Sequence, residues 1–226
     1  MSEERKTIYL CLAHLSEDRL EQKYVQEAFD TNWVVPMGPN VTAFEEDLRK
    51  FVTGNVESAV YQDSRWPEAT AAAWNLNPAL KDTKVVCLSA GTAAVHLALL
   101  ACGVGPGDEV CVQSFTFCAS SHPITYLGAT PVFIDSEAET WNMDPQLLEN
   151  AILDRKEKTG KYPKAIVPVA LYGMPYKIDE IMAVADKYGI PVVEDAAEGM
   201  GSRFNGQVLG TFGKFGVLSF NGNKMI

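Results

Sequence analysis

The sequence is poor in histidine and in positive charge. Among 226 residues there are 3 histidines, and 19 lysines and arginines stand against 29 aspartates and glutamates, which gives a formal net charge of -10. Nucleic-acid-binding proteins present a basic face, and anionic membrane surfaces attract basic segments. The charge balance therefore argues against both partners, and the scattered positions of His14, His96 and His122 argue against a metal site. A local phosphate site remains compatible with the negative net charge, because backbone amides bind anions without net positive charge on the protein.

The sequence also lacks paired cysteines and long apolar runs. Its 5 cysteines include no C-x-x-C pair, and an odd number at irregular spacing is typical of free thiols in a reducing compartment. No apolar run reaches the roughly 18 residues that a membrane span needs. The charged start MSEERKTIYL has no apolar signal-peptide core. We therefore expect a soluble cytoplasmic protein.

Two catalytic signatures are missing as well. A dinucleotide-binding dehydrogenase carries G-x-G-x-x-G between a strand and a helix, but GVGPGDEV follows a predicted helix, and GMGSRF lacks the third glycine. A serine hydrolase carries G-x-S-x-G, and no such segment occurs. Cys118 offers a thiol nucleophile, but we expect a buried structural cysteine there, which is the commoner case.

What the sequence does have is a regular alternation of strand and helix patterns from residue 84 onward. Strands are expected at 84–88, 109–113, 130–135, 165–169, 191–194 and 217–220, and helices at 92–102, 119–126, 145–158 and 179–187. This alternation predicts an α/β fold, with a mostly parallel sheet and helices on both faces. Two more helices are expected at 16–29 and 41–52, whereas residues 55–83 show no clear pattern and are interpreted as an insertion.

The segment SAGTAAVHLAL, residues 89–99, joins a predicted strand to a predicted helix. A helix N-terminus offers free backbone amides and the positive end of the helix dipole. Gly91 lets a ligand approach the backbone, and Thr92 adds a hydroxyl, so the segment can hold a phosphate. A tight turn with Thr92 as the helix cap is the alternative, and taken alone it is the commoner case.

Two further segments place ligand-binding side chains at predicted strand ends, where open α/β sheets bind their ligands. In QSFTFCASSHPI, Phe115 or Phe117 can stack on a planar ring, although a core aromatic pair explains them as well. In PVVEDAAEGMG, Asp195 can receive a protonated ring nitrogen, and Glu198 can reach the same cleft. Buried acids need partners, but the spacing of these two also fits a capping box at a helix start.

The last segment is SFNGNKMI, in which an apolar strand and a sharp NGN turn precede Lys224. A lysine held there and desolvated is a nucleophilic amine, whereas a solvated lysine after a strand is the usual alternative. Taken together, the four segments supply a phosphate cradle, a stacking ring, an acid for a ring nitrogen and an amine for an aldehyde. These four features match the phosphate, the aromatic ring, the ring nitrogen and the aldehyde of pyridoxal 5′-phosphate.

With these motifs the sequence resembles the DegT/DnrJ/EryC1/StrS sugar aminotransferases, which have the aspartate-aminotransferase fold (fold type I). The resemblance lies in NWVVPMGPNVTAFEEDLRKF, SAGTAAVHLAL, GVGPGDEV, LGATPVFID, VEDAAEGMGS and SFNGNKMI, and it covers most of the chain apart from residues 55–83. SFNGNK looks especially like the branch that aminates UDP-linked 4-keto-6-deoxy-N-acetylhexosamines of the bacillosamine type. Family members with histidine in place of the lysine act as dehydratases, so Lys224 indicates an aminotransferase.

The resemblance implies a role for each site residue. Lys224 carries pyridoxal 5′-phosphate, Asp195 pairs with the pyridine nitrogen, Phe117 stacks on the ring and Glu198 lies beside it. The residues that hold the phosphate are Thr92, Ala93 and Ser219.

The resemblance also implies partners and a domain plan. The partners are an amino donor, glutamate in most of the family, a nucleotide-linked keto-sugar and a second protomer in a homodimer. The apolar loop TNWVVPMGPN is expected at that interface or at the pocket mouth. Residues 1–54 form an N-terminal helical segment and 84–226 a partial cofactor-binding domain, because the family fold continues well past its lysine. A C-terminally incomplete fold is thus expected, and a cofactor-binding fragment without catalysis is the alternative.

Overall fold

The computed structural model describes residues 16–54 and 80–224. Its α-helices are α1 (Leu20–Asp30), α2 (Pro39–Thr53), α4 (Gly91–Ala101), α5 (His122–Tyr126), α6 (Pro145–Thr159) and α7 (Ile178–Tyr188). Its strands are β1 (Glu109–Gln113), β2 (Thr130–Ile134), β3 (Ala165–Val167), β4 (Val193–Asp195), β5 (Arg203–Phe204), β6 (Gln207–Val208) and β7 (Phe215–Val217). The described ranges also contain the short 3-10 helices η3 (Cys118–Ser120) and η4 (Leu171–Gly173).

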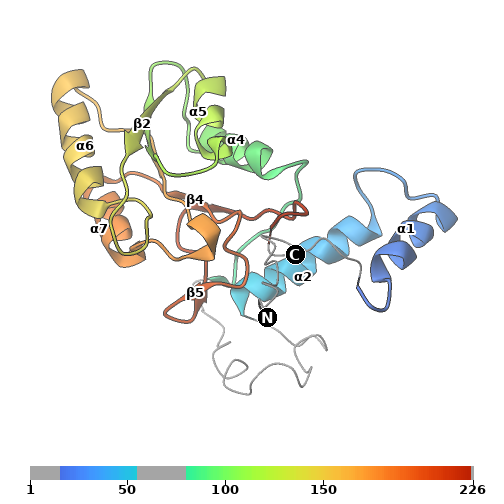
Figure 1. Ribbon diagram of the computed structural model, residues 1–226. Coiled ribbons are helices and arrows are strands. Elements are labelled where there is room, and N and C mark those ends of the chain that lie inside the picture. Colours follow the sequence, from blue (N-terminus) through green and yellow to red (C-terminus); the bar gives the residue numbers. More distant parts are fainter. Residues whose placement is uncertain (1–15, 55–79, 225–226) are drawn as a thin grey trace, which may run out of the picture.

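Parallel strands form the centre of the molecule (Figure 1). β1 pairs with β2 and β3, and β4 pairs with β7, in each case in parallel. Isolated parallel bridges at Ile166–Val192 and Val169–Asp195 join the two groups, so that the strands follow the order β2-β1-β3-β4-β7. The α/β fold with a mostly parallel sheet is therefore confirmed.

Helices cover both faces of this sheet. α6 and α7 contribute to one core cluster, which includes Ile181, and α4 and α5 contribute to another, which includes Leu99. Along β1, Cys111 belongs to the first cluster, and Val110 and Val112 belong to the second. Successive side chains of a strand point to opposite faces, and both faces are buried here. This explains why the strand sequences are apolar without alternation.

The N-terminal helices lie to one side of the sheet (Figure 1). α2 packs through Leu48 and Val52 against Val208 of β6, whereas α1 has no buried residue. The helix expected to start at Ser16 starts at Leu20, whose amide donates to the Ser16 hydroxyl oxygen at 3.0 Å. None of the helices in the described ranges is long and apolar enough to cross a membrane.

Two strand predictions need correction. Residues 84–88 are not a strand: within the described ranges no strand pairs with them, and the Cys87 amide donates to Glu45 Oε1 at 2.7 Å. An apolar segment becomes a strand only where another strand accepts its hydrogen bonds. The final strand lies at Phe215–Val217 rather than at 217–220, because its register with β4 is set at these residues.

The sequence analysis also missed the antiparallel hairpin of β5 and β6. Its turn consists of Asn205 and Gly206, with φ angles of 49° and 84°. An Asn-Gly pair is the preferred sequence for a two-residue turn of this kind, so FNGQV carried a usable signal. Residues 55–79 of the predicted insertion lie outside the described ranges.

Candidate active site

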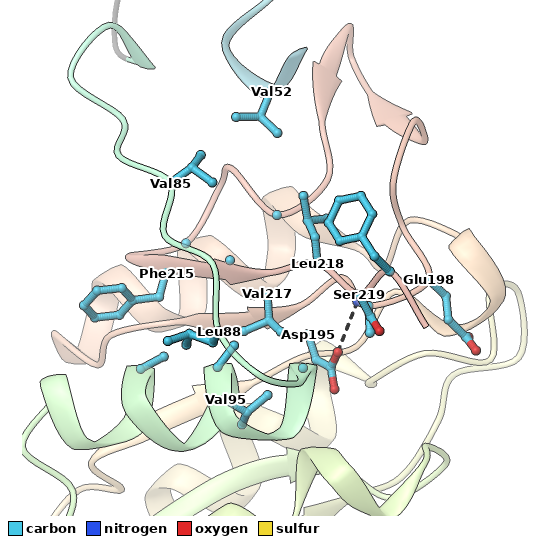
Figure 2. Close-up of a pocket in the computed structure, with 18 of the residues that line it drawn as sticks. Val52, Val85, Leu88, Val95, Asp195, Glu198, Phe215, Val217, Leu218 and Ser219 are labelled. Atoms are coloured by element: carbon cyan, nitrogen blue, oxygen red, sulfur yellow. Dashed lines mark hydrogen bonds between the residues drawn. The ribbon is translucent and has the colours of Figure 1, made fainter. Parts of the chain in front are cut away.

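A large cavity opens at the carboxyl ends of β4 and β7 (Figure 2). It is bordered by the first turn of α4, the loop after β1, and the segments that follow β4 and β7. The predicted cofactor residues that line it are Thr92, Phe117, Asp195, Glu198, Ser219 and Lys224. Ala93 lies in the first turn of α4 but does not line the cavity. The structure thus gathers residues from four distant segments at the edge of the sheet where ligands of this fold class bind.

Asp195 is the last residue of β4 and is 6% exposed. Its Oδ2 accepts a hydrogen bond from Ser120 Oγ at 2.6 Å, and its Oδ1 accepts one from the Ala197 amide at 3.2 Å. Burial raises the pKa of Asp195, and the hydrogen bonds from Ser120 and Ala197 oppose that rise. The capping-box interpretation is wrong, because residues 196–201 form turns and no helix begins there.

Lys224 reaches Glu198 across the cavity. Its Nζ donates to Glu198 Oε1 at 3.0 Å, and its side chain is 14% exposed. Glu198 Oε2 accepts the Tyr172 amide at 2.7 Å, which fixes the carboxylate. The low exposure fits the expected desolvation, and the ion pair with Glu198 is a contact that the sequence analysis did not predict. The amine must lose a proton before it can act as a nucleophile, and the carboxylate in contact with it is an available acceptor.

The first turn of α4 lies beside Ser219. The helix starts at Gly91 after an extended Ala90, and its first backbone bond runs from the Ala94 amide to the Ala90 carbonyl at 3.1 Å. The amides of residues 91–93 therefore have no intrahelical acceptor. A Cβ placed on Gly91 would lie 3.8 Å from Ser219 Oγ. The helix cap is Ala90, so the interpretation of Thr92 as the cap is wrong. Thr92 and Ser219 both line the cavity beside these free amides.

The aromatic side chains after β1 are open to solvent. Phe117 is 70% exposed and Phe115 is 50% exposed, so the interpretation as a core aromatic pair is wrong. Phe115 packs against Trp141 with ring centroids 6.2 Å apart, and both Phe115 and Phe117 border the cavity. Cys118, expected to be buried, is exposed.

Three positioning residues went unrecognised in the sequence. Gln113 is fully buried, and its Nε2 donates to the Phe115 carbonyl at 2.8 Å, which holds the aromatic loop. Ser120 is fully buried against Asp195. Nothing in the spacing of a single glutamine or serine predicts such a contact.

Glu194 is the third, and it points away from Asp195. Its Oε1 accepts the Gly213 amide at 2.6 Å and the Phe212 amide at 2.5 Å, and its Oε2 accepts the Gly210 amide at 3.2 Å. Burial raises its pKa, and these backbone bonds oppose the rise. Burial raises the pKa of the Tyr176 hydroxyl, and the nearby Glu194 carboxylate raises it further, although that hydroxyl has no hydrogen bond of good geometry. Adjacent acids on a strand face opposite ways, so Glu194 serves the fold and Asp195 serves the cavity.

The fold and the cavity together define a class: an α/β domain that can hold a phosphorylated aromatic compound beside a lysine. The chain belongs to the DegT/DnrJ/EryC1/StrS aminotransferase family, whose model matches residues 67–226. The resemblance of its motifs to this family is thereby confirmed.

Individual relatives agree with that assignment. EpsN of Bacillus subtilis, named as a pyridoxal phosphate-dependent aminotransferase, is 45% identical over 221 residues, which are 98% of this chain and 49% of EpsN. A UDP-N-acetyl-3-dehydro-alpha-D-glucosamine 3-aminotransferase of Acidithiobacillus ferrooxidans is 46% identical over 140 residues, or 62% of this chain and 36% of that protein.

A solved structure shows the same fold. The sugar aminotransferase Spr1654 of Streptococcus pneumoniae in its apo form superposes with a TM-score of 0.74 at 30% identity, over 96% of this chain and 49% of that one. The same protein has been solved in a PLP form and in a PMP form. The chain spans about half the length of the relatives that it matches.

Proposed function

We propose that this chain is the cofactor-binding part of a pyridoxal 5′-phosphate-dependent aminotransferase that acts on a nucleotide-linked keto-sugar. The observation that carries the proposal is the convergence of Lys224, Asp195 and the first turn of α4 on one cavity. Figure 2 shows Asp195, Glu198 and Ser219 gathered near the helix that bears Val95, which is α4.

The chemistry of the donor set fits this cofactor. Asp195 receives two hydrogen bonds and keeps acceptor capacity for a protonated ring nitrogen. The free amides of residues 91–93, with the hydroxyls of Thr92 and Ser219, suit a phosphate group. Phe117 offers an exposed ring for stacking, and Lys224 offers a primary amine for the aldehyde.

When bound, pyridoxal 5′-phosphate supplies an electron sink that stabilises negative charge on the amino donor's Cα. The residues of the chain hold and move protons around it. Asp195 keeps the ring nitrogen protonated through its buried carboxylate. Lys224 Nζ takes the proton from Cα of the amino donor and passes it on to the cofactor. Glu198 Oε1, 3.0 Å from that nitrogen, is placed to accept its proton.

The substrates belong to the same proposal. Glutamate is the expected amino donor, and the expected acceptor is the C4 ketone of a UDP-linked 4-keto-6-deoxy-N-acetylhexosamine, because of the SFNGNK motif. The relative named for 3-amination supports a 3-keto sugar as the second candidate. Parallel assays with a 3-keto and a 4-keto nucleotide sugar discriminate the two, since the product amine sits on a different carbon.

We extend the proposal to a cytoplasmic homodimer. The free thiols of Cys87, Cys102, Cys111 and Cys118 favour a reducing compartment. In the loop TNWVVPMGPN, Trp33 is 51% exposed. Such an apolar patch generally has a partner, and isologous pairing is the commonest assembly of soluble enzymes.

The test of cofactor binding is chemical. The protein is mixed with pyridoxal 5′-phosphate, reduced with borohydride and digested, and the adduct should map to Lys224. Lys214 also lines the cavity and is the matched control: Lys224→Ala should abolish the adduct, and Lys214→Ala should leave it. An adduct on Lys214 would overturn the assignment. A bound cofactor without turnover would favour the alternative of a non-catalytic cofactor-binding fragment.

A further inference from the structure

Two hydroxyl groups form a short chain behind Asp195. Ser120 Oγ donates to Asp195 Oδ2 at 2.6 Å, and Thr116 Oγ1 lies 2.8 Å from Ser120 Oγ. We call Thr116 and Ser120 the hydroxyl pair. Ser120 is fully buried on η3, whereas Thr116 is half-buried in the loop after β1 and borders the cavity. The hydroxyl pair therefore connects the loop that carries the aromatic side chains to the end of β4.

The direction of this chain follows from proton counting. A hydroxyl has one hydrogen to donate, and an ionised carboxylate can only accept. Ser120 therefore donates its only hydroxyl hydrogen to an ionised Asp195, and Thr116 must then donate to Ser120. Each donation polarises the next group in the chain, which strengthens the bond to the carboxylate. A hydrogen bond to a charged acceptor is also the stronger kind.

We propose that Ser120 is a positioning residue for Asp195, supported in turn by Thr116, and that the hydroxyl pair keeps the Asp195 carboxylate ionised and oriented to accept a protonated ring nitrogen. The role of the ring nitrogen rests on the function proposed above. The effect on the carboxylate itself does not rest on it, because it follows from the contacts of Thr116 with Ser120 and of Ser120 with Asp195.

Asp195 needs this support because its surroundings disfavour a charge. Burial raises its pKa, and Ser120 is the largest influence that opposes the rise, followed by the Ala197 amide and the positive charge of Lys224. Glu198 acts in the same direction as burial. Lys224 and Glu198 are bonded to each other at 3.0 Å, so their charges largely offset one another at Asp195. The hydrogen bonds from Ser120 and from the Ala197 amide then do most to keep the carboxylate ionised, and the one from Ser120 is the larger influence.

The test compares Ser120→Ala and Thr116→Val with Ser121→Ala. Ser121 is the matched control, since it lies on the same turn and its hydroxyl donates to the Cys118 carbonyl at 3.2 Å rather than to Asp195. The first readout is the titration midpoint of the Asp195 carboxyl carbon, followed by NMR in the cofactor-free protein. We expect Ser120→Ala to raise the midpoint, Thr116→Val to raise it less, and Ser121→Ala to leave it unchanged.

The second readout is the affinity for pyridoxal 5′-phosphate, followed by absorbance. Loss of a hydrogen bond to a charged group corresponds to a fall of about tenfold or more, which we expect for Ser120→Ala, with rescue in Ser120→Thr. An unmoved midpoint in Ser120→Ala, or an equal shift in Ser121→Ala, would overturn the inference. If Ser120→Ala does not fold, Thr116→Val, at a half-buried position, is the variant that tests the inference: an unmoved Asp195 midpoint in it would overturn the role of the hydroxyl pair. A wild-type protein that takes up no cofactor refutes the proposed function instead, and the titration remains decisive for Ser120.

Discussion

Gly216, in the middle of β7, is the position at which one added methyl group should do most damage. A Cβ built there would lie 2.7 Å from Gly210 Cα and closer still to the Gly210 carbonyl oxygen. These are backbone atoms, so no side-chain rotation can relieve the contact. Gly216 is the register partner of Glu194, and its side chain would therefore enter the face on which Glu194 binds the 210–213 turn.

The expected cost of Gly216→Ala follows from what has to move. Overpacking costs about 1–3 kcal/mol when neighbours can adjust. Here the turn must move away from Glu194, which breaks or lengthens its bonds from the amides of Gly210, Phe212 and Gly213. At about 1 kcal/mol for each bond, the three bonds add about 3 kcal/mol to the overpacking cost, so the total loss is about 4–6 kcal/mol. That is a large part of the 5–15 kcal/mol by which typical domains are stable.

Urea unfolding followed by circular dichroism measures this loss directly. The control is Gly222→Ala, because a Cβ on Gly222 would meet nothing within 4 Å and its backbone has no special conformation. We expect that control to stay close to the wild-type free energy of unfolding. A Gly216→Ala protein as stable as the wild type would refute the packing of β7 against the Glu194-bound turn.

Four further predictions concern three separate parts of the molecule. Because burial raises the pKa of Asp195, its carboxyl contributes most stability below its ordinary pKa and loses that contribution as pH rises through the raised value. Cofactor-free Asp195→Asn should therefore gain stability relative to wild type as pH rises above about 4, the ordinary pKa of an aspartate carboxyl, and a relative loss over that rise would contradict this. The same variant of the full-length enzyme should lose most activity while it still binds the cofactor. Asp144→Ala should cost about 1 kcal/mol in unfolding free energy, because it removes the α6 cap that accepts the Gln146 amide at 2.7 Å. Sedimentation of the full-length protein should show a dimer that Trp33→Glu weakens, and an active monomer would remove the shared-site proposal.

The fold could be predicted from the sequence because its signals are local. The β1 boundaries were correct to the residue, and α6 begins after its Asp144 cap as expected. The prediction of a strand at 84–88 was wrong because strand formation there depends on a non-local signal. Whether an apolar, β-branched segment becomes a strand depends on a neighbour far away in the chain, and no such neighbour can be read from the segment itself.

The candidate site was predictable in its members and not in their contacts. Strand ends and a helix start indicated where Thr92, Asp195 and Ser219 would lie, since parallel strands bring their carboxyl ends to one edge. The ion pair of Lys224 with Glu198 was not predictable, because it depends on the turn at residues 196–201 that replaces the expected helix start. Hydroxyl and amide contacts such as those of Ser120 and Gln113 depend on atomic distances, which residue spacing does not encode.

The two adjacent acids of β4 explain how the cavity keeps its shape. Glu194 fixes the 210–213 turn through backbone amides, and this turn leads directly into β7. β7 aligns Val217 with Asp195, which sets the start of the segment that carries Ser219 and Lys224. A single strand end thus positions both sides of the site: Asp195 directly, and the lysine segment through Glu194. It follows that a substitution of Glu194 should disturb the placement of Lys224, although Glu194 itself does not line the cavity. The yield of borohydride-trapped cofactor at Lys224 in Glu194→Gln measures this indirect effect. The unfolding free energy of the same variant shows how much of the loss is due to general destabilisation.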